Sequence, residues 1–132
     1  MEPEKIKILL VDDQESVLKG LRMRLELEDD LWVTGEANDG FRALELAVEL
    51  RPDIIVMDLE MPKMDGISAA KALHELAPEV TVIMLSMHSD PTLRARAREA
   101  GVWAFVEKRE GAVNLIREIH RWFENKKSSR IS

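Results

Sequence analysis

Hydrophobic residues in this chain gather in short runs in which nearly every position is apolar. Four such runs lie at residues 6–11, 54–57, 80–85 and 104–106, and a weaker fifth candidate lies at residues 32–37. A strand with one face in water alternates apolar and polar residues, whereas continuous runs suit strands buried on both faces, as in a parallel sheet. The pattern therefore predicts five strands, most of them fully buried.

The stretches between these runs, and the one after the last, carry apolar residues at helical spacing, which places them on one face of a helix. Strand and helix thus alternate five times. This alternation predicts an α/β fold: a doubly wound five-stranded parallel sheet, in the order 2-1-3-4-5, with helices on both faces in the flavodoxin-like (βα)5 arrangement. The predicted inward-facing residues are Val17, Leu18, Leu21 and Leu25; Phe41, Leu44, Ala47 and Val48; Ile67, Ala70, Leu73 and Ala77; and Ala112, Leu115, Ile116, Ile119 and Phe123.

The fourth helical stretch, residues 91–100, is poor in large apolar groups. Leu93 is its one bulky apolar residue, among alanines and charged side chains. Pro91 suits the first turn of a helix, and Asp90 suits the cap before it. Because this helix has little apolar area to bury, we expect it to be the least stable element of the fold.

Composition narrows the function classes. The chain has 132 residues, a formal net charge of −6 and no cysteine. This length suits one domain, and the lack of cysteine excludes disulfides and thiolate metal sites. The negative charge argues against direct binding of nucleic acid, and no apolar run approaches the ~20 residues of a membrane helix. We therefore expect a cytoplasmic domain that binds neither nucleic acid nor membrane.

Five chemically active residues come at the ends of the predicted strands. Asp12 and Asp13 follow the first strand, and Asp58 ends the third. Ser86 ends the fourth strand, and Lys108 follows the fifth. The carboxyl ends of parallel strands share one edge of the sheet, where ligands bind in open α/β folds. In the predicted strand order, these side chains converge on one crevice.

Three carboxylates in one crevice repel each other, so one must take a proton or a cation must enter. Mg²⁺ suits such a site, because it binds one or two carboxylates together with water and a phosphate oxygen; Mn²⁺ is expected to substitute. A metal, acids, a lysine and a hydroxyl together are typical of phosphoryl transfer. A carboxylate nucleophile at this site would form an acyl phosphate.

The motifs at residues 9–13, 57–66, 85–88 and 101–108 (LLVDD, MDLEMPKMDG, LSMH and GVWAFVEK) occur in this order at four strand ends. The set resembles the receiver domain of two-component response regulators, over about residues 5–125. The stretch LSMHSD at residues 85–90 is most similar to receivers of the LuxR/NarL-type group. The combination is far more specific than any single motif.

The resemblance implies a role for each acid. Asp58 matches the phosphoacceptor. Asp13 and Asp58 match the side-chain ligands of Mg²⁺, and the backbone carbonyl of Glu60 matches a third protein ligand. Asp12 matches the acid that reaches the metal through water. The implied function is a switch that takes a phosphoryl group from the phosphohistidine of a sensor histidine kinase.

The other matched residues are implied to work after or around the transfer. Lys108 would contact the phosphoryl oxygens, Ser86 would act as the switch hydroxyl, and Phe105 as the switch aromatic. Glu60 and His88 each lie two residues after a site residue, where they would flank the attacking water and tune the lifetime of the phosphoryl group.

The resemblance also bears on organisation and partners. It implies a receiver domain at residues 1–125, followed at residues 126–132 by a polar tail or the start of a linker. The fourth helix, fifth strand and fifth helix would form the output face, where we expect any homodimer to assemble. Trp103 lies two residues before Phe105, so strand alternation places both on the same side. Trp103 would then either pack under the fourth helix or border the output face.

Two positions depart from the common pattern of the family. Arg109 follows Lys108 where many receivers have a proline after a cis bond. A cis bond before a residue other than proline costs about 3 kcal/mol, so we expect a trans bond here. Ser86 and Phe105 replace the commoner threonine and tyrosine, and Phe105 lacks the phenol that could donate a hydrogen bond.

Single residues also have simpler interpretations. Paired acids suit the start of a helix, and a lone lysine is usually solvated. We expect the three histidines, which lack metal-ligand spacing, and three arginines of the fourth helix to lie on the surface. These residues are His74, His88 and His120, and Arg94, Arg96 and Arg98.

Three alternative functions remain. A docking scaffold that works without phosphorylation is compatible with the same fold. An aspartyl-nucleophile phosphohydrolase would usually have two acids spaced two apart after the first strand, whereas Asp12 and Asp13 are adjacent. A flavin-binding module would need a glycine- and hydroxyl-rich loop after the first strand, where this chain has acids.

Overall fold

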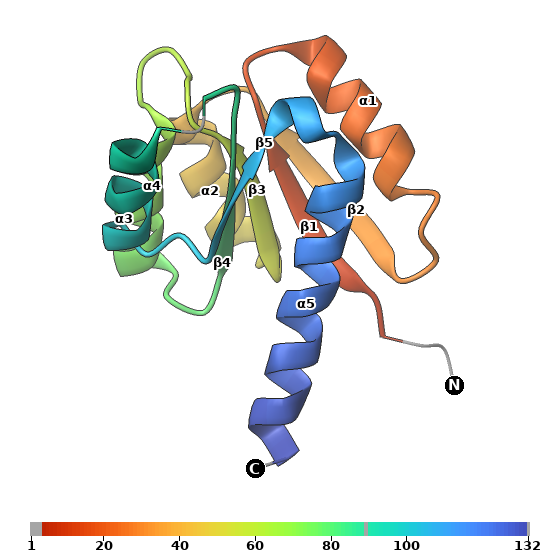
Figure 1. The fold of residues 1–132 in the computed structure, drawn as a ribbon. Coiled ribbons are helices and arrows are strands. Elements are labelled where there is room, and N and C mark those ends of the chain that lie inside the picture. The colour runs from red at the N-terminus through yellow and green to blue at the C-terminus, as the bar shows by residue number, and fades with distance from the viewer. Residues whose placement is uncertain (1–3, 89, 132) are drawn as a thin grey trace.

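The computed structural model describes residues 4–88 and 90–131, in which five parallel strands form one sheet with helices on both faces (Figure 1). The strand order is β2-β1-β3-β4-β5, which confirms the predicted order and fold class. The predicted start of the domain, residue 1, and the predicted end of the tail, residue 132, lie outside the described residues. The strands are β1 (Ile6–Val11), β2 (Leu31–Ala37), β3 (Ile54–Asp58), β4 (Thr81–Ser86) and β5 (Ala104–Glu107).

Helices connect the strands and cover the sheet in two layers. Residues of α1 and α5 pack with one face of the sheet, and residues of α2, α3 and α4 pack with the other. No helix in the described ranges has the length and apolar character needed to cross a membrane. The helices are α1 (Glu15–Leu25), α2 (Gly40–Leu50), α3 (Gly66–Leu76), α4 (Pro91–Glu99) and α5 (Ala112–Ile131), with a short 3-10 turn, η1 (Lys108–Glu110), before α5.

The central strands are buried on both faces, as their continuous apolar runs predict. All five residues of β3 are buried. Ile55 and Met57 pack toward α2 and α3, whereas Ile54 and Val56 pack toward α1 and α5. Because successive side chains of a strand point to opposite faces, a strand between two helical layers needs apolar residues at every position.

The predicted inward stripe of α2 is wrong at two of its four residues, Phe41 and Val48. Phe41 and Val48 are each 53% exposed. Ala47 is buried as predicted, and the helix buries Ala43 and Leu46 with it. Both sets have helical spacing, so periodicity alone does not separate them. The second set contains the smaller side chains, which allow the helix to lie close against the sheet and α3.

The polar C-terminal segment, residues 126–131, continues α5 as a helix. The helix runs to Ile131, beyond the edge of the sheet (Figure 1). Side-chain contacts at i,i+4 spacing support the extension. The ammonium of Lys126 lies 5.0 Å from the ring centre of Trp122, and that of Lys127 lies 5.6 Å from the ring centre of Phe123. A linker beginning here stays a prediction.

The start of α4 is formed as predicted. The helix begins at Pro91, and the Asp90 carboxylate accepts a hydrogen bond from the Thr92 backbone N–H at 2.7 Å. Ala97 is its one fully buried residue, and Leu93 is partly buried against the core. The helix therefore buries little apolar area, which is the reason why we expect it to be the least stable element.

Candidate functional site

The residues predicted to converge do meet at the carboxyl edge of the sheet. Asp58 is the last residue of β3 and Ser86 is the last of β4, while Asp12 directly follows β1. All three are nearly inaccessible: Asp12 is 1% exposed, Asp58 is 3% exposed and Ser86 is 0% exposed. Buried polar side chains at this edge need partners within the protein or a bound ion.

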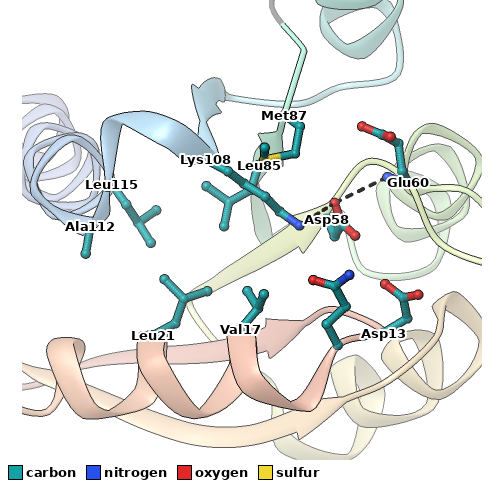
Figure 2. A pocket seen from close by; sticks show the side chains of 12 residues that line it. Asp13, Val17, Leu21, Asp58, Glu60, Leu85, Met87, Lys108, Ala112 and Leu115 are labelled. Atoms are coloured by element: carbon teal, nitrogen blue, oxygen red, sulfur yellow. Dashed lines mark hydrogen bonds and ion pairs between the residues drawn. The ribbon is translucent and has the colours of Figure 1, made fainter.

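Lys108 extends from the first position of η1 to the buried carboxylates of Asp12 and Asp58, and Figure 2 shows it beside Asp58. Its ammonium nitrogen lies 2.9 Å from Asp12 Oδ2 and 3.1 Å from Asp58 Oδ1. The side chain of Lys108 is 16% exposed, so water screens these ion pairs weakly. The lysine therefore joins the ends of β1, β3 and β5 in one charged cluster.

Lys108 offsets only part of the unfavourable environment of the Asp58 carboxylate. Burial, and then the neighbouring charge of Asp12, raise the pKa of Asp58 to about 6, against the opposing effect of Lys108. Burial alone would lower the pKa of Lys108, but its contacts with Asp12 and Asp58 outweigh burial and raise it. The site thus holds a charged lysine and a carboxylate that favours further positive charge.

The loop after β3 fixes the backbone beside Asp58. The backbone N–H of Glu60 donates to Asp58 Oδ1 at 3.3 Å, and the N–H of Gly66 donates to the carbonyl of Leu59 at 2.8 Å. A Cβ atom on Gly66 would lie 2.5 Å from the backbone oxygen of Asp58, so only glycine allows this close approach. Asp65 then caps α3, accepting from Ser68 N–H at 2.9 Å.

The three aspartates have the chemistry of a hard-cation site. One carboxylate oxygen from each of Asp12, Asp13 and Asp58 lies within 4.8 Å of the others. Asp13 is exposed and the other two are buried, so the cluster is open to solvent on one side. Oxygen ligands, crowded negative charge and an open side are what Mg²⁺ requires of a protein site.

A second set of polar contacts connects the β3 and β4 loops. The hydroxyl of Ser86 donates to Glu60 Oε1 at 3.4 Å and accepts from the backbone N–H of His88 at 3.0 Å. His88 Nε2 lies 3.4 Å from Glu60 Oε2. The sequence placed Glu60 and His88 separately beside the site. Their contact with each other, between carboxylate and imidazole, connects the two loops and could not be predicted from their positions in the sequence.

Phe105 on β5 is partly buried and covered by a residue of α4. The guanidinium carbon of Arg94 lies 4.7 Å from the centre of the Phe105 ring. Arg94 also pairs with Glu107 at 3.7 Å, and Glu107 pairs with Arg109 at 3.2 Å. Arg94 lies on the surface as expected, with 39% of its side chain exposed, but it also bridges α4 to the strand that bears the aromatic residue.

Trp103 does not share a side with Phe105, contrary to expectation. Trp103 packs with the core layer of α1 and α5, and Arg121 of α5 lies 4.8 Å from the centre of its ring. Phe105 packs with the opposite layer. Trp103 precedes β5, which begins at Ala104, so the two-residue alternation of a strand does not extend to it.

The peptide bond between Lys108 and Arg109 is trans, as the missing proline predicts; no cis bond occurs among the described residues. The backbone turns through η1 and leaves it at Gly111, which has a φ of 78°. A glycine tolerates this left-handed value without strain. The turn therefore positions Lys108 without the usual proline.

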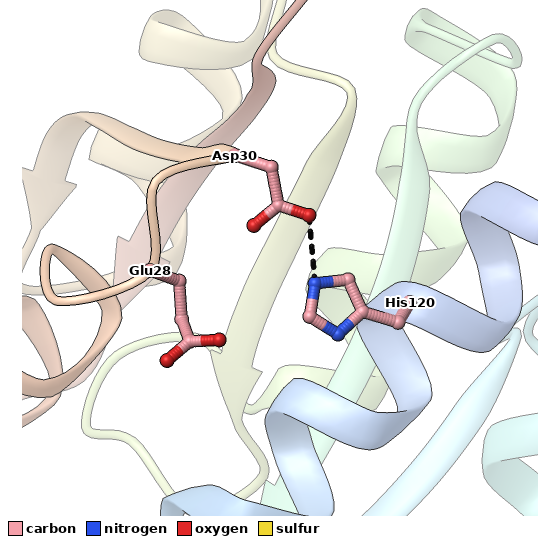
Figure 3. Close-up of side chains that lie close together, drawn as sticks. All are labelled: Glu28, Asp30 and His120. Atoms are coloured by element: carbon pink, nitrogen blue, oxygen red, sulfur yellow. Dashed lines mark hydrogen bonds and ion pairs between the residues drawn. The ribbon is translucent and has the colours of Figure 1, made fainter.

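Among the described residues, a second group of side chains that could hold a metal ion lies away from this edge (Figure 3). His120 Nε2 on α5 lies 2.8 Å from Asp30 Oδ2, and Glu28 lies close to both. Glu28 also pairs with Arg24 at 3.1 Å. Spacing along the chain does not indicate this group, because Asp30 and His120 are 90 positions apart and only the fold brings them together.

The sequence reasoning also missed a groove beside Asp58. The groove has a volume of about 500 Å³ and extends between α1 and α5 (Figure 2). Val17 and Leu21 of α1 line it, four residues apart on the helix that directly follows the paired acids. Both were assigned to the core stripe. Their position at the start of that stripe, close to Asp12 and Asp13, could have indicated that they lie beside the site.

Comparison with known proteins agrees with this geometry. A family model described as the response regulator receiver domain matches residues 8–120. The chain is 40% identical to the transcriptional regulatory protein LiaR of Bacillus subtilis over 110 residues, covering 83% of this chain and 52% of LiaR. It is 42% identical to a protein-glutamate methylesterase/protein-glutamine glutaminase of Caldanaerobacter subterraneus over 113 residues, 85% of this chain and 31% of that protein.

Among solved structures, the receiver domain of a NarL response regulator from Mycobacterium tuberculosis superposes with a TM-score of 0.86. The two are 30% identical, and the match covers 90% of this chain and 96% of that one. The resemblance to LuxR/NarL-type receivers is thus confirmed. The chain spans about half the length of LiaR.

Proposed function

This chain belongs to the response-regulator receiver family, and we propose that Asp58 is the residue through which it is phosphorylated. Receivers of this family are phosphorylation-activated switches in two-component signalling. The observation that carries the assignment is the ammonium of Lys108, held 3.1 Å from Asp58 Oδ1 and 2.9 Å from Asp12 Oδ2 at the buried ends of three strands.

The proposed chemistry follows from these neighbours. Asp58 attacks the phosphorus of the donor as a carboxylate, and Lys108 offsets the charge on the phosphoryl oxygens. Mg²⁺ held by Asp13, Asp58 and the carbonyl of Glu60, with Asp12 reaching it through water, would supply the remaining positive charge. The raised pKa of Asp58, about 6, supports a cation at this position, because positive charge relieves the cause of the shift.

The proposed switch uses the residues that adjoin Asp58 on β4 and β5. The Ser86 hydroxyl, which contacts Glu60 at 3.4 Å, would turn toward the phosphoryl oxygen. Phe105 would then rotate into the space that is vacated, and α4 would shift with it. The sparse burial of α4, with only Ala97 fully buried in that helix, supports a local change of small energetic cost.

We propose a sensor histidine kinase as the donor and a second copy of the chain as the partner on α4, β5 and α5. The chain would promote only its own phosphorylation and dephosphorylation. Similarity to a methylesterase extends over 31% of that relative, and the proposal does not extend the activity of that protein to this chain. Regulation of transcription is the output that we propose, with other segments contacting DNA, because this chain carries a net charge of −6.

Intact-mass spectrometry after incubation with acetyl phosphate tests the assignment. We expect a mass gain of one phosphoryl group that requires Mg²⁺ or Mn²⁺ and is lost in Asp58→Asn. Asp29→Asn is the matched control, because Asp29 is an exposed aspartate remote from the site. Equal labelling of Asp58→Asn would refute the proposal. Lack of labelling in the wild type would favour a phosphorylation-independent scaffold.

A phosphohydrolase is the remaining enzymatic alternative. Such an enzyme would use its aspartyl nucleophile to hydrolyse many molecules of a phosphate ester in succession. The adjacent acids after β1 and the position of Asp58 at the end of β3 count against it. Continuous release of phosphate from a phosphomonoester such as p-nitrophenyl phosphate, abolished by Asp58→Asn, would support that alternative over the switch.

A further inference from the structure

The groove beside Asp58 changes character along its length (Figure 2). Near the strand ends it is bounded by Asp58 and Lys108. Toward its other end, α1 contributes Val17 and Leu21, and α5 contributes Leu115. One continuous space of about 500 Å³ therefore joins a charged phosphoryl-binding end to an apolar end.

The apolar end offers surface that a ligand can cover. Val17, Leu21 and Ala112 are each only partly buried, and Met87 at the rim is 57% exposed. Binding sites for small molecules are commonly about 300–1,000 Å³, mostly apolar, with a few polar groups that fix orientation. The groove fits this description, with Lys108 as the orienting cation.

We infer that this groove selects the leaving group of a small phosphodonor, and that it favours an acyl phosphate with an apolar acyl group over acetyl phosphate. The inference rests on the proposed function, because the donor must deliver its phosphoryl group to Asp58. Charge complementarity places the phosphoryl group at Lys108. The rest of the donor then lies along the side chains of Val17 and Leu21.

The transfer step balances without any further reactant. A bond forms between an Asp58 carboxylate oxygen and phosphorus, while the bond from phosphorus to the bridging oxygen of the donor breaks. The bonding electrons leave on that oxygen, so the donor departs as a free carboxylate. In an in-line displacement the leaving group lies on the side of phosphorus opposite the attacking oxygen. The groove opens beside Asp58 and Lys108, so a leaving group on its side of phosphorus can extend along Val17 and Leu21.

Competing rates of phosphorylation test the selection. Benzoyl phosphate and acetyl phosphate have leaving groups of similar basicity, but the phenyl ring buries far more apolar surface than a methyl group. We expect the 132-residue chain with Mg²⁺ to react roughly tenfold faster with benzoyl phosphate at equal, subsaturating concentration. Intact-mass spectrometry over time gives both rates.

Variants at the groove identify the residue responsible. Leu21→Ala should lower the ratio of the benzoyl to the acetyl rate several-fold, and Leu21→Met, which conserves volume, should keep it. Val48→Ala on α2 is the matched control, because Val48 is a 53% exposed apolar residue outside the groove. Its ratio should equal that of the wild type.

A binding readout is independent of transfer. Phenacylphosphonate carries a methylene group in place of the bridging oxygen of benzoyl phosphate, so it binds without reacting. In methyl NMR spectra we expect this probe to shift the resonances of Val17 and Leu21, and to leave those of Val48 unchanged. This measurement uses the wild-type chain, so it does not depend on the stability of any variant.

The outcomes separate the inference from the function on which it rests. If neither donor labels Asp58, the proposed function fails. If both donors label Asp58 at equal rates, or if Leu21→Ala keeps the preference for benzoyl phosphate, phosphorylation stands and the inference is overturned. Shifts confined to residues outside the groove would overturn it as well.

Discussion

Arg94 of α4 stacks on Phe105 of β5, with the guanidinium carbon 4.7 Å from the centre of the ring. The same side chain pairs with Glu107 at 3.7 Å. Phe105 has no phenol to hold it by a hydrogen bond, so the arginine is the polar group that covers it. Any rotation of this ring must disturb the contact between α4 and β5.

Loss of Arg94 should therefore favour the activated conformation, provided that Phe105 rotates on activation. An exposed cation–π contact contributes about 0.5–1 kcal/mol, so Arg94→Gln should bind beryllofluoride with Mg²⁺ about twofold to fivefold more tightly. Titration followed by NMR measures the affinity. Arg98→Gln is the control on the same helix, and an Arg94→Gln affinity equal to that of this control would contradict the prediction.

Magnesium should stabilise the fold by binding the cluster of Asp12, Asp13 and Asp58. At ten times the dissociation constant, the free energy of unfolding should rise by about 1.4 kcal/mol, seen as an increase in Tm. Asp13→Asn should weaken this increase and raise the Tm of the metal-free protein, because it removes a repelling charge. Melting curves that do not respond to millimolar Mg²⁺ would show that the cluster is not a metal site.

The pH dependence of stability should report the burial of Asp58. Folding raises the pKa of this carboxyl from its ordinary value of 3.8 to about 6, so the folded state holds the proton more tightly. In metal-free buffer, this residue's contribution to the free energy of unfolding should therefore be greatest below pH 3.8 and fall as pH rises to about 6.

Asp58→Asn has no group to titrate at this position. Its free energy of unfolding, relative to wild type, should rise across the same interval by up to about 3 kcal/mol. Urea denaturation at a series of pH values measures the difference. A difference that stays constant between pH 4 and 6 would show that the pKa of Asp58 is not raised.

The sequence could predict those features that depend on local pattern and strand order. Continuous apolar runs identified β1, β3, β4 and β5, and the acids at their ends then fell at one edge of the sheet. The face of α2 could not be predicted in the same way, because two sets of apolar residues share its helical spacing. Burial of Ala43 in place of Phe41 depends on how closely the helix approaches the sheet.

Contacts between segments that are distant in sequence could not be predicted from the hydrophobic pattern either. Arg94 and Glu107 belong to different elements, and nothing in their spacing indicates a pair. His120 meets Asp30 only because α5 returns across the end of α1. The extension of α5 through Lys126 and Lys127 involves stacking on Trp122 and Phe123, which a polar composition alone does not suggest.

The lifetime of the phosphoryl group should depend on the contact between Glu60 and His88, which are 3.4 Å apart. The two side chains lie beside Asp58 and Ser86, where we expect them to border the path of the attacking water. Glu60→Gln and His88→Asn should each change the rate of dephosphorylation several-fold without preventing phosphorylation. Loss of the phosphoryl group over time, followed by intact mass, gives the rate, and Glu79→Gln, at an exposed site elsewhere, is the control. Identical decay in all four proteins would count against this role.

The central claim is that Asp58 itself carries the phosphoryl group, and chemical trapping tests it most directly. Borohydride reduces an acyl phosphate, so aspartate becomes homoserine only where the phosphoryl group was attached. After reaction with acetyl phosphate and Mg²⁺, peptide mapping should find homoserine at position 58 and unmodified aspartate at positions 12 and 13. Homoserine at position 12 or 13, or its absence from position 58 in protein that has gained a phosphoryl group, would contradict the account.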